Sequence, residues 1–443
     1  MRFRLQIPCC LFAICGALLI PSPAAAQNTY VWTGATSSNW NTAGNWNPNG
    51  VPGGNPEDIA DFNTAACTAV TFSQSVELEA VSFGYGPACG FQIPLSTLLH
   101  LHDGILNLST TTSNTFTIDT GGMLWLDQSG DDANSKIVNN GAVYFTGASS
   151  AGTAQITNNA GATIYFADSS TAANAVIYNG ATVDYSYMTA PSTLGSIADG
   201  IAGAKIFLGG QTLSIGSLNY TQTIDGSIAD GGSNGGSGGA LTKVGTGFLQ
   251  LTGNDTYTGD TTVQQGLLEV DGNLASPEVI VETGATLAGA GTLAGTLAAQ
   301  AGSSIIPGDV YNPSASPPNT TLTAGRLLCA SSPTVETRIG NVGSATRGDY
   351  LSLNSPLQSG FCPHLHFSFL SAGLPLTVGD SYLLILIQGS TDYTAGNVDF
   401  DFNNFPSYRQ ANGTIVIANL VSVSAIYLHL ADLGDEIFAN DFD

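Results

Sequence analysis

Two His-x-His pairs are the residues of this chain best suited to binding a metal ion. His100 and His102 form one pair, followed by Asp103, and His364 and His366 form the other. Residues i and i+2 of a β-strand face the same side, so each pair could chelate a divalent cation. The alternative is that alternating Leu and His residues form an ordinary half-exposed strand. Because no group of Cys or His residues in the sequence completes a tetrahedral site, we expect no metal centre and no cofactor.

A second candidate for cation binding is the acidic group Asp127, Asp131 and Asp132. Several carboxylate oxygens together suit Ca²⁺. The spacing of an EF-hand is absent, and no Gly-Gly-x-Gly-x-Asp series repeats in the sequence. We therefore interpret these residues as solvated acids in turns.

The composition argues against catalysis and against nucleic-acid binding. The 443 residues contain 9 Lys and Arg against 33 Asp and Glu, which gives a formal net charge of −24. A polysaccharide lyase needs a basic residue as its base, and a glycosidase needs two carboxylates at a defined separation. The basic residues are scattered, and neither a Gly-x-Ser-x-Gly elbow nor a phosphate-binding loop occurs. A nucleic-acid binder needs a basic surface. We expect a protein that is not an enzyme and binds no nucleic acid.

The N-terminal segment 1–26 has the three parts of a secretory signal peptide. Arg2 and Arg4 supply the charged part, residues 9–20 the apolar part, and the small residues up to Ala26 the cleavage site. A single membrane anchor is the alternative, but the apolar run is shorter than the ~18–20 residues that span a bilayer. We expect an exported protein with no transmembrane segment after cleavage.

Four Cys residues lie beyond the predicted signal peptide: Cys67, Cys89, Cys329 and Cys362. An even number in an exported chain indicates two disulfides, for which three connectivities exist. We favour the pairs closest in sequence, Cys67 with Cys89 and Cys329 with Cys362. Four buried thiols are the alternative.

Short strands separated by Gly, Asn and Asp recur at a fixed interval along the chain. We expect these strands to place the candidate His, acidic and Cys residues. Apolar residues return at a constant step, with a small residue two positions before each. The apolar series is Leu249, Leu268, Leu287 and Ile306, and the small series is Gly247, Gly266, Ala285 and Ser304. This period describes a right-handed parallel β-helix, in which each turn stacks on the next at ~4.8 Å.

An earlier block repeats in the same way with a slightly looser period. Asn residues follow the first apolar series by two positions and suit stacked turns. The four series are Ile137, Ile156 and Ile177; Asn139, Asn158 and Asn179; Val143, Ile164 and Val183; and Phe145, Phe166 and Tyr185.

Residues 240–272 resemble the autotransporter-associated β-strand repeat of bacterial surface and secreted proteins. The residues that carry the resemblance are Lys243, Gly245, Gly247, Leu249, Leu251, Asn254, Tyr257, Gly259, Gly266, Leu268 and Val270. The resemblance implies a β-helical, passenger-like stem that is secreted or held at the outer cell surface, with a structural or adhesin-like role. The residues after the last predicted turn are too few for the translocator barrel of a conventional autotransporter, so we expect the chain to lack it.

These observations predict an all-β chain with four regions. Residues 1–26 form the signal peptide, 27–66 a Trp-rich N-terminal cap, 67–310 the parallel β-helix, and 311–443 a β-rich C-terminal module and tail. Trp32, Trp40 and Trp46 either cover the first turn or form an exposed platform for glycans. The expected partners are an extracellular glycan or the surface of a host or neighbouring cell. A glycan-binding or polysaccharide-cleaving β-helix is the alternative function.

Overall fold

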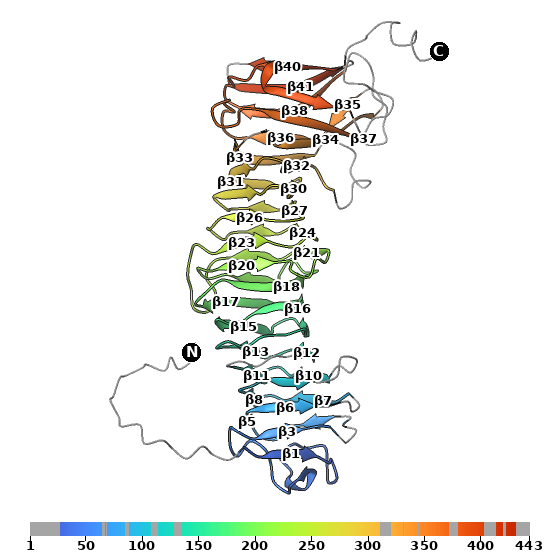
Figure 1. The fold of residues 1–443 in the computed structure, drawn as a ribbon, viewed down its shortest axis with the longest axis vertical. Helices are drawn as coiled ribbons and strands as arrows, with labels where there is room; N and C mark the ends of the chain where they lie inside the picture. The colour runs from blue at the N-terminus through green and yellow to red at the C-terminus, as the bar shows by residue number, and fades with distance from the viewer. Residues whose placement is uncertain are drawn as a thin grey trace, which may run out of the picture.

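A computed structural model shows the chain as a rod of stacked β-strands (Figure 1). It describes residues 27–63, 67, 69–84, 88–107, 114–127, 135–310, 320–330, 332–342, 345–371, 380–402, 413–419 and 422–430. The predicted signal peptide, Asp131 and Asp132 lie outside these residues. Two single-turn 3-10 helices, η1 (Ala43–Asn45) and η2 (Ala395–Asn397), are the only helices in the described part of the chain. None of its helices has the length and apolar character needed to cross a membrane.

Three long parallel sheets and a shorter one make up the rod. The strands of the longest sheet succeed one another in this order: β4 (Val70–Thr71), β7 (Gly90–Ile93), β10 (Asn114–Ile118), β12 (Ser135–Asn139), β14 (Gln155–Asn158), β16 (Ala172–Asn179), β18 (Ser192–Ala198), β20 (Thr212–Ile215), β23 (Ala240–Lys243), β26 (Thr261–Val263), β29 (Glu278–Val281), β31 (Thr292–Ala299), β33 (Thr321–Cys329), β36 (Tyr350–Leu353) and β38 (Ser381–Gln388), with β25 (Asn254–Asp255) and β28 (Asn273–Leu274) beside it.

The other sheets run along the same axis. The 8-stranded sheet contains β5 (Val76–Leu78), β8 (Leu98–Leu101), β11 (Met123–Leu126), β13 (Ala142–Phe145), β15 (Thr163–Asp168), β17 (Thr182–Met188), β19 (Lys205–Phe207) and β22 (Ser227–Ala229). The 9-stranded sheet contains β21 (Gln222–Ile224), β24 (Phe248–Leu251), β27 (Leu267–Val270), β30 (Thr286–Gly289), β32 (Ser304–Pro307), β34 (Thr334–Val342), β35 (Ala345–Gly348), β37 (Leu365–Ser371) and β39 (Val398–Asp401). The shorter sheet contains β1 (Thr29–Trp32), β2 (Trp46–Asn47), β3 (Ile59–Asp61), β6 (Ala80–Phe83) and β9 (Ile105–Asn107).

The predicted stacking of like residues is confirmed in the earlier block. Ile156 lies in register with Ile137 and Ile177, and all three are fully buried. The Asn158 amide accepts a hydrogen bond from Asn139 at 2.9 Å and donates one to Asn179 at 2.8 Å. These buried amides satisfy one another along the rod axis, so the polar series costs little to bury.

The predicted register is wrong for one residue of the later apolar series, Ile306. Leu249, Leu268 and Leu287 are in register, but Leu287 pairs with Ile305 rather than with the predicted Ile306. Ser304 correspondingly pairs with Thr286, not with Ala285. The turn that leads from β30 to β32 is one residue shorter than its predecessors, and the sequence period does not reveal this.

Both predicted boundaries of the β-helix need correction. Parallel pairing already begins with β1 on β3 and β3 on β6, so the residues assigned to a separate cap contribute strands to the stack. At the other end, parallel pairing continues past residue 310 through β36 on β38 and β37 on β39. The step from Leu297 to its partner Leu327 is longer than the step of the predicted repeat, so the period disappears while the stacking persists. The antiparallel strands β40 (Gly413–Asn419) and β41 (Val423–Leu430) close this end.

Candidate functional site

The first His-x-His pair lies in a cluster with two carboxylates from neighbouring turns. Glu77 on β5 is in register with His100 on β8, and His102 directly follows that strand. Glu77 Oε1 lies 3.6 Å from His100 Nδ1 and 3.1 Å from His102 Nε2. Asp127 Oδ2 lies 2.9 Å from His100 Nε2, and its Oδ1 lies 3.0 Å from His102 Nδ1. Both His residues and Asp127 stand out as candidates in the sequence, whereas Glu77 and its contact with the His pair become visible only in the structure.

The electrostatics of this cluster are dominated by negative charge. Burial lowers the pKa of His102, but the hydrogen bonds and charges of Asp127 and Glu77 outweigh this effect and raise it overall. The pKa of Glu79 is raised by burial and then by the charges of Glu57 and Asp103. Asp103, predicted to accompany the His pair, thus helps to raise the pKa of the neighbouring Glu79 carboxyl through its charge.

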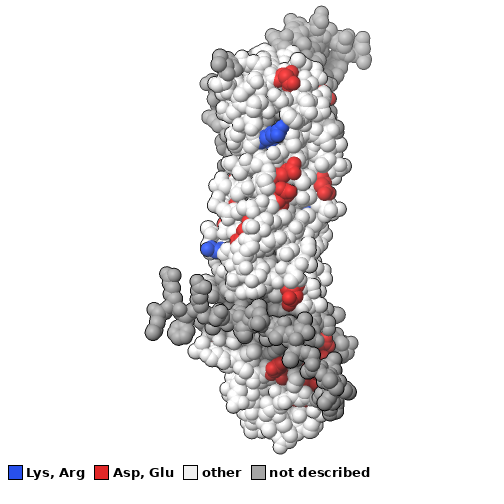
Figure 2. All heavy atoms as spheres, turned by 90° about the vertical axis from the view of Figure 1, so that its left-hand side faces the viewer, with Lys and Arg blue, Asp and Glu red and all other residues white. Residues whose placement is uncertain are grey.

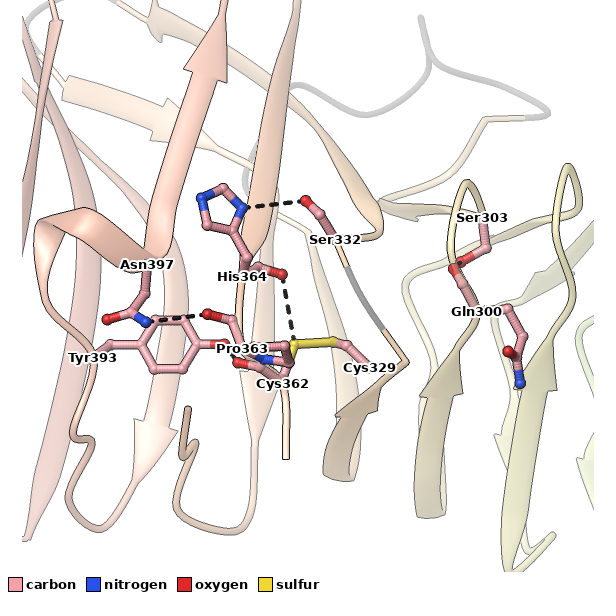
Figure 3. The surroundings of a disulfide bond; sticks show 9 residues. All are labelled: Gln300, Ser303, Cys329, Ser332, Cys362, Pro363, His364, Tyr393 and Asn397. Atoms are coloured by element: carbon pink, nitrogen blue, oxygen red, sulfur yellow. Dashed lines mark hydrogen bonds between the residues drawn. A yellow bond between two sulfur atoms is a disulfide. The ribbon is translucent and has the colours of Figure 1, made fainter. Parts of the chain in front are cut away.

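The second His-x-His pair is arranged differently. His366 uses both ring nitrogens, with Nδ1 2.9 Å from Asp399 Oδ1 and Nε2 3.0 Å from Asp401 Oδ2. The ring of His364 turns toward Ser332, whose Oγ lies 3.3 Å from Nδ1, beside a disulfide (Figure 3). Asp399 Oδ1 also lies 3.8 Å from His364 Nδ1. Unlike Asp127 in the first pair, however, Asp399 is within hydrogen-bond distance of only one of the two rings.

Both disulfide pairings predicted from the sequence are confirmed. Cys67 and Cys89 have Cα atoms 5.0 Å apart, and those of Cys329 and Cys362 are 4.4 Å apart. Tyr393 donates a hydrogen bond to the Cys362 carbonyl, as Figure 3 shows. Each disulfide joins two segments that lie in successive turns of the stack.

The Trp residues near the N-terminus do not form an exposed platform. Trp32, Trp40 and Trp46 expose 2%, 0% and 3% of their surface. Their rings pack against one another and against Phe62. A buried ring has no open face for a sugar, so the suggested glycan platform is wrong and the rings instead cover the end of the stack.

A ladder of partly exposed aromatic rings runs along the outer face of the 8-stranded sheet. His100 stacks on Trp125 with ring centroids 4.7 Å apart, and Tyr144 stacks on Tyr165 at 4.7 Å. Tyr187 continues the series beyond Tyr165. Because the stacked rings cover one another's faces, they are only partly exposed to solvent. The buried residues Phe145, Phe166 and Tyr185 next to this ladder were predicted from the sequence, whereas the outer series itself was not.

The residues of the predicted repeat have structural roles. Lys243 is fully buried, and its ammonium donates to the carbonyls of Val244, Gly245 and Gln265 at 2.8, 2.8 and 3.2 Å. Burial lowers the pKa of Lys243 to about 8. Gly245 has φ of +69°, and a Cβ there would clash with the Gly216 carbonyl oxygen, so only glycine fits.

The remaining repeat residues divide between core and surface. Tyr257 is buried, with its hydroxyl 2.5 Å from Thr261 Oγ1. Asn254 is exposed and lies in register with Asn273, which pairs with Thr292. The other repeat residues are buried apolar side chains or close-packed glycines: Gly247, Leu249, Leu251, Gly259, Gly266, Leu268 and Val270.

A polar groove of about 770 Å³ lies beside this repeat. Asn254, Asn273 and Thr292 line it together with Asp225 and Asp271. Side chains of this kind donate and accept hydrogen bonds at the surface, as ligands rich in hydroxyl groups require. The groove is therefore a candidate binding surface.

Buried carboxyl groups near the groove make the stability of the fold depend on pH. Asp255 is 2% exposed, and burial raises its pKa to about 7, whereas an Asp in an unfolded chain titrates near 3.9. The folded state therefore holds a proton that the unfolded state releases above about pH 4. This contribution to stability is present at low pH and is lost as pH rises through about 7.

Asp255→Asn should weaken this pH dependence. The amide oxygen of Asn can still accept the 2.8 Å hydrogen bond from the Ile228 amide. We expect the free energy of unfolding to fall less between about pH 5 and pH 8 in the variant than in the parent chain, by roughly 2 kcal/mol. Urea unfolding at both pH values measures this. Asp260→Asn, at an exposed position, should retain the parent dependence, and an equal fall in all three proteins would contradict the role of Asp255.

Comparison with known proteins supports the resemblance found in the sequence. Residues 241–270 match a family model described as passenger-associated-transport-repeat. An extracellular serine protease of Serratia marcescens is 51% identical over 71 residues, which cover 16% of this chain and 7% of the relative. The adhesin BmaC autotransporter of Brucella suis biovar 1 (strain 1330) is 40% identical over 72 residues, 16% of this chain and 2% of the relative. The chain thus spans only a small part of the relatives it matches.

The fold and the repeat together define the general kind of protein. The chain is an all-β solenoid that carries a repeat of the autotransporter-passenger type. Passenger regions with such repeats are secreted or exposed at the cell surface.

Proposed function

We propose that this chain is a non-catalytic, adhesin-like stem of the autotransporter-passenger kind, displayed on or released from a bacterial surface. The observation that carries the proposal is the uninterrupted parallel stack, in which the passenger-type repeat forms successive turns and its one Lys is buried as a structural group. Among the relatives, the one named as an adhesin supports the adhesive role.

The partner is expected to be an extracellular glycan or the surface of a host or neighbouring cell. Figure 2 shows a face that is mostly uncharged, with scattered acidic groups and isolated basic ones. Such a surface does not attract anionic polymers, so recognition would rely on hydrogen bonds from the polar groove and the edges of the aromatic ladder. The groove residues Asn254, Asn273 and Thr292 stack in register, as do the ladder residues from His100 to Tyr165.

A gene-deletion strain tests the adhesive role. Cells lacking the gene should attach to host cells or to one another less than the parent, and attachment should return when the gene is restored. A restored copy with Asn254→Ala and Asn273→Ala should fold but attach less well if the groove is the binding surface. Unchanged attachment of the deletion strain would contradict the proposal.

A glycan-binding or polysaccharide-cleaving β-helix is the second candidate, and the polar groove is the observation that favours it. Asp225 and Asp271 line the groove, so two carboxylates face one open space. A glycan array measures binding, and a reducing-sugar assay measures cleavage. Binding without cleavage is compatible with the stem function, whereas cleavage that disappears in Asp271→Asn would replace that function by an enzymatic one.

A further inference from the structure

We propose that Glu77, His100 and His102 bind one divalent transition-metal ion, Zn²⁺ being the best match, on the outer face of the 8-stranded sheet. One carboxylate oxygen and two imidazole nitrogens are available, and these atoms all lie within 4.8 Å of one another. Two His residues and one carboxylate are a ligand set that Zn²⁺ uses in proteins, with a fourth position open to water or substrate. Imidazole ligands favour Zn²⁺ over Ca²⁺ and Mg²⁺, which prefer oxygen ligands alone.

The distances suit a metal ion. Zn–N and Zn–O bonds of about 2.0–2.1 Å in a tetrahedral site place the donor atoms ~3.3 Å apart. Glu77 Oε1 lies 3.1 Å from His102 Nε2 and 3.6 Å from His100 Nδ1, on either side of that value. The two His nitrogens lie within 4.8 Å of each other, and rotation of the side chains would bring all three donor atoms to the tetrahedral separation. The side chain of Glu77 is 56% exposed, so an ion can enter from solvent without moving the backbone.

Asp127 holds both imidazole rings in the orientation that metal binding requires. Its two oxygens lie 2.9 and 3.0 Å from His100 Nε2 and His102 Nδ1, the nitrogens that face away from Glu77. A ring N–H that donates to a carboxylate leaves the opposite nitrogen as the lone-pair donor, as in most protein His–metal sites. The ring of Trp125 stacks on His100 at 4.7 Å with planes inclined by 22°, which limits rotation further.

The charge of the cluster also favours a divalent ion. A divalent ion would offset the negative charge that Glu77 and Asp127 bring to the cluster. The same contacts can instead form without metal if both His residues are protonated and paired with the carboxylates. The two cases differ in whether the chain binds metal stoichiometrically.

A Zn²⁺ titration against a chromophoric chelator distinguishes them. The chain is prepared without a His tag, since a tag would itself bind the ion. We expect saturable binding of one Zn²⁺ per chain. Glu77→Gln and His102→Gln should each weaken binding by at least about 10–100-fold, and Asp127→Asn should weaken it by about tenfold without changing the stoichiometry. Thermal unfolding in EDTA, with a midpoint close to that of the parent, shows that each variant is folded.

The second His-x-His pair provides the matched control. In His366→Gln, the proposed site is intact, so affinity and stoichiometry should equal those of the parent. Absence of saturable binding in the parent would overturn the proposal and leave a metal-free ion-pair cluster. Retention of binding in both Glu77→Gln and His102→Gln, or its loss in His366→Gln, would overturn it equally by locating the ion elsewhere.

Discussion

Ile156→Asp should destabilise the protein by at least about 4 kcal/mol. Ile156 is fully buried between Ile137 and Ile177, which lie in register on the adjacent turns. A carboxylate at this position would lose its hydration with only apolar side chains of the same series above and below it. The expected result is a strongly reduced midpoint in thermal unfolding, or loss of soluble protein.

Gln155→Asp is the matched control for this substitution. Gln155 precedes Ile156 on β14 and is exposed, so the same new charge stays in water there. We expect a change of less than about 0.5 kcal/mol. Similar unfolding midpoints for the two variants would mean that Ile156 does not face the interior of the rod.

Lys243→Met should cost about 2–4 kcal/mol, the second largest effect. Methionine approximates the volume of the Lys side chain, so the packing is largely kept. The carbonyls of Val244, Gly245 and Gln265 would, however, lose the ammonium that donates to all three. Chemical denaturation of the variant and the parent measures the difference.

Lys205→Met tests whether the effect depends on burial. Lys205 is exposed and lies over the ring of Phe207, with its ammonium 6.0 Å from the ring centroid. We expect this substitution to cost less than about 1 kcal/mol. An equally mild effect of Lys243→Met would contradict a structural role for the buried ammonium of the repeat lysine.

The fold could be predicted from the sequence because stacked turns place like residues over like residues. The Ile137, Ile156 and Ile177 series and the Asn series keep nearly constant steps, so their register is visible without a structure. The pairing of Cys67 with Cys89 follows from a sequence separation of 22, close to one turn. The period fails where turns change length, as between Leu287 and Ile305.

Changes in turn length also explain why the candidate metal site could be predicted only in part from the sequence. His100 and His102 are two residues apart, and their common face follows from strand geometry. Glu77 and Asp127 come from the turns before and after, and the steps from Glu77 to His100 and from His100 to Trp125 are longer than the step of the later repeat. The sequence period therefore does not place Glu77 and Asp127 next to the His pair. For the N-terminal Trp rings, the sequence offered two alternatives, and the structure selects the one in which they cover the first turn.

Stacking of successive turns in register underlies both the proposed stem function and the proposed metal site, and disulfide trapping tests it most directly. Val138 and Thr157 are register partners on adjacent turns. Their Cα atoms should lie about 4.8 Å apart, inside the ~4.4–6.8 Å range of disulfides. In Val138→Cys/Gln155→Cys, the offset of two residues increases the separation to roughly 8 Å.

Each double variant is oxidised, and the cross-linked peptides are identified by mass spectrometry. Stacking in register predicts a disulfide in Val138→Cys/Thr157→Cys and little disulfide formation in Val138→Cys/Gln155→Cys. The two native disulfides should stay intact in both variants. Efficient cross-linking of the offset pair, with none in the register pair, would contradict the parallel stack.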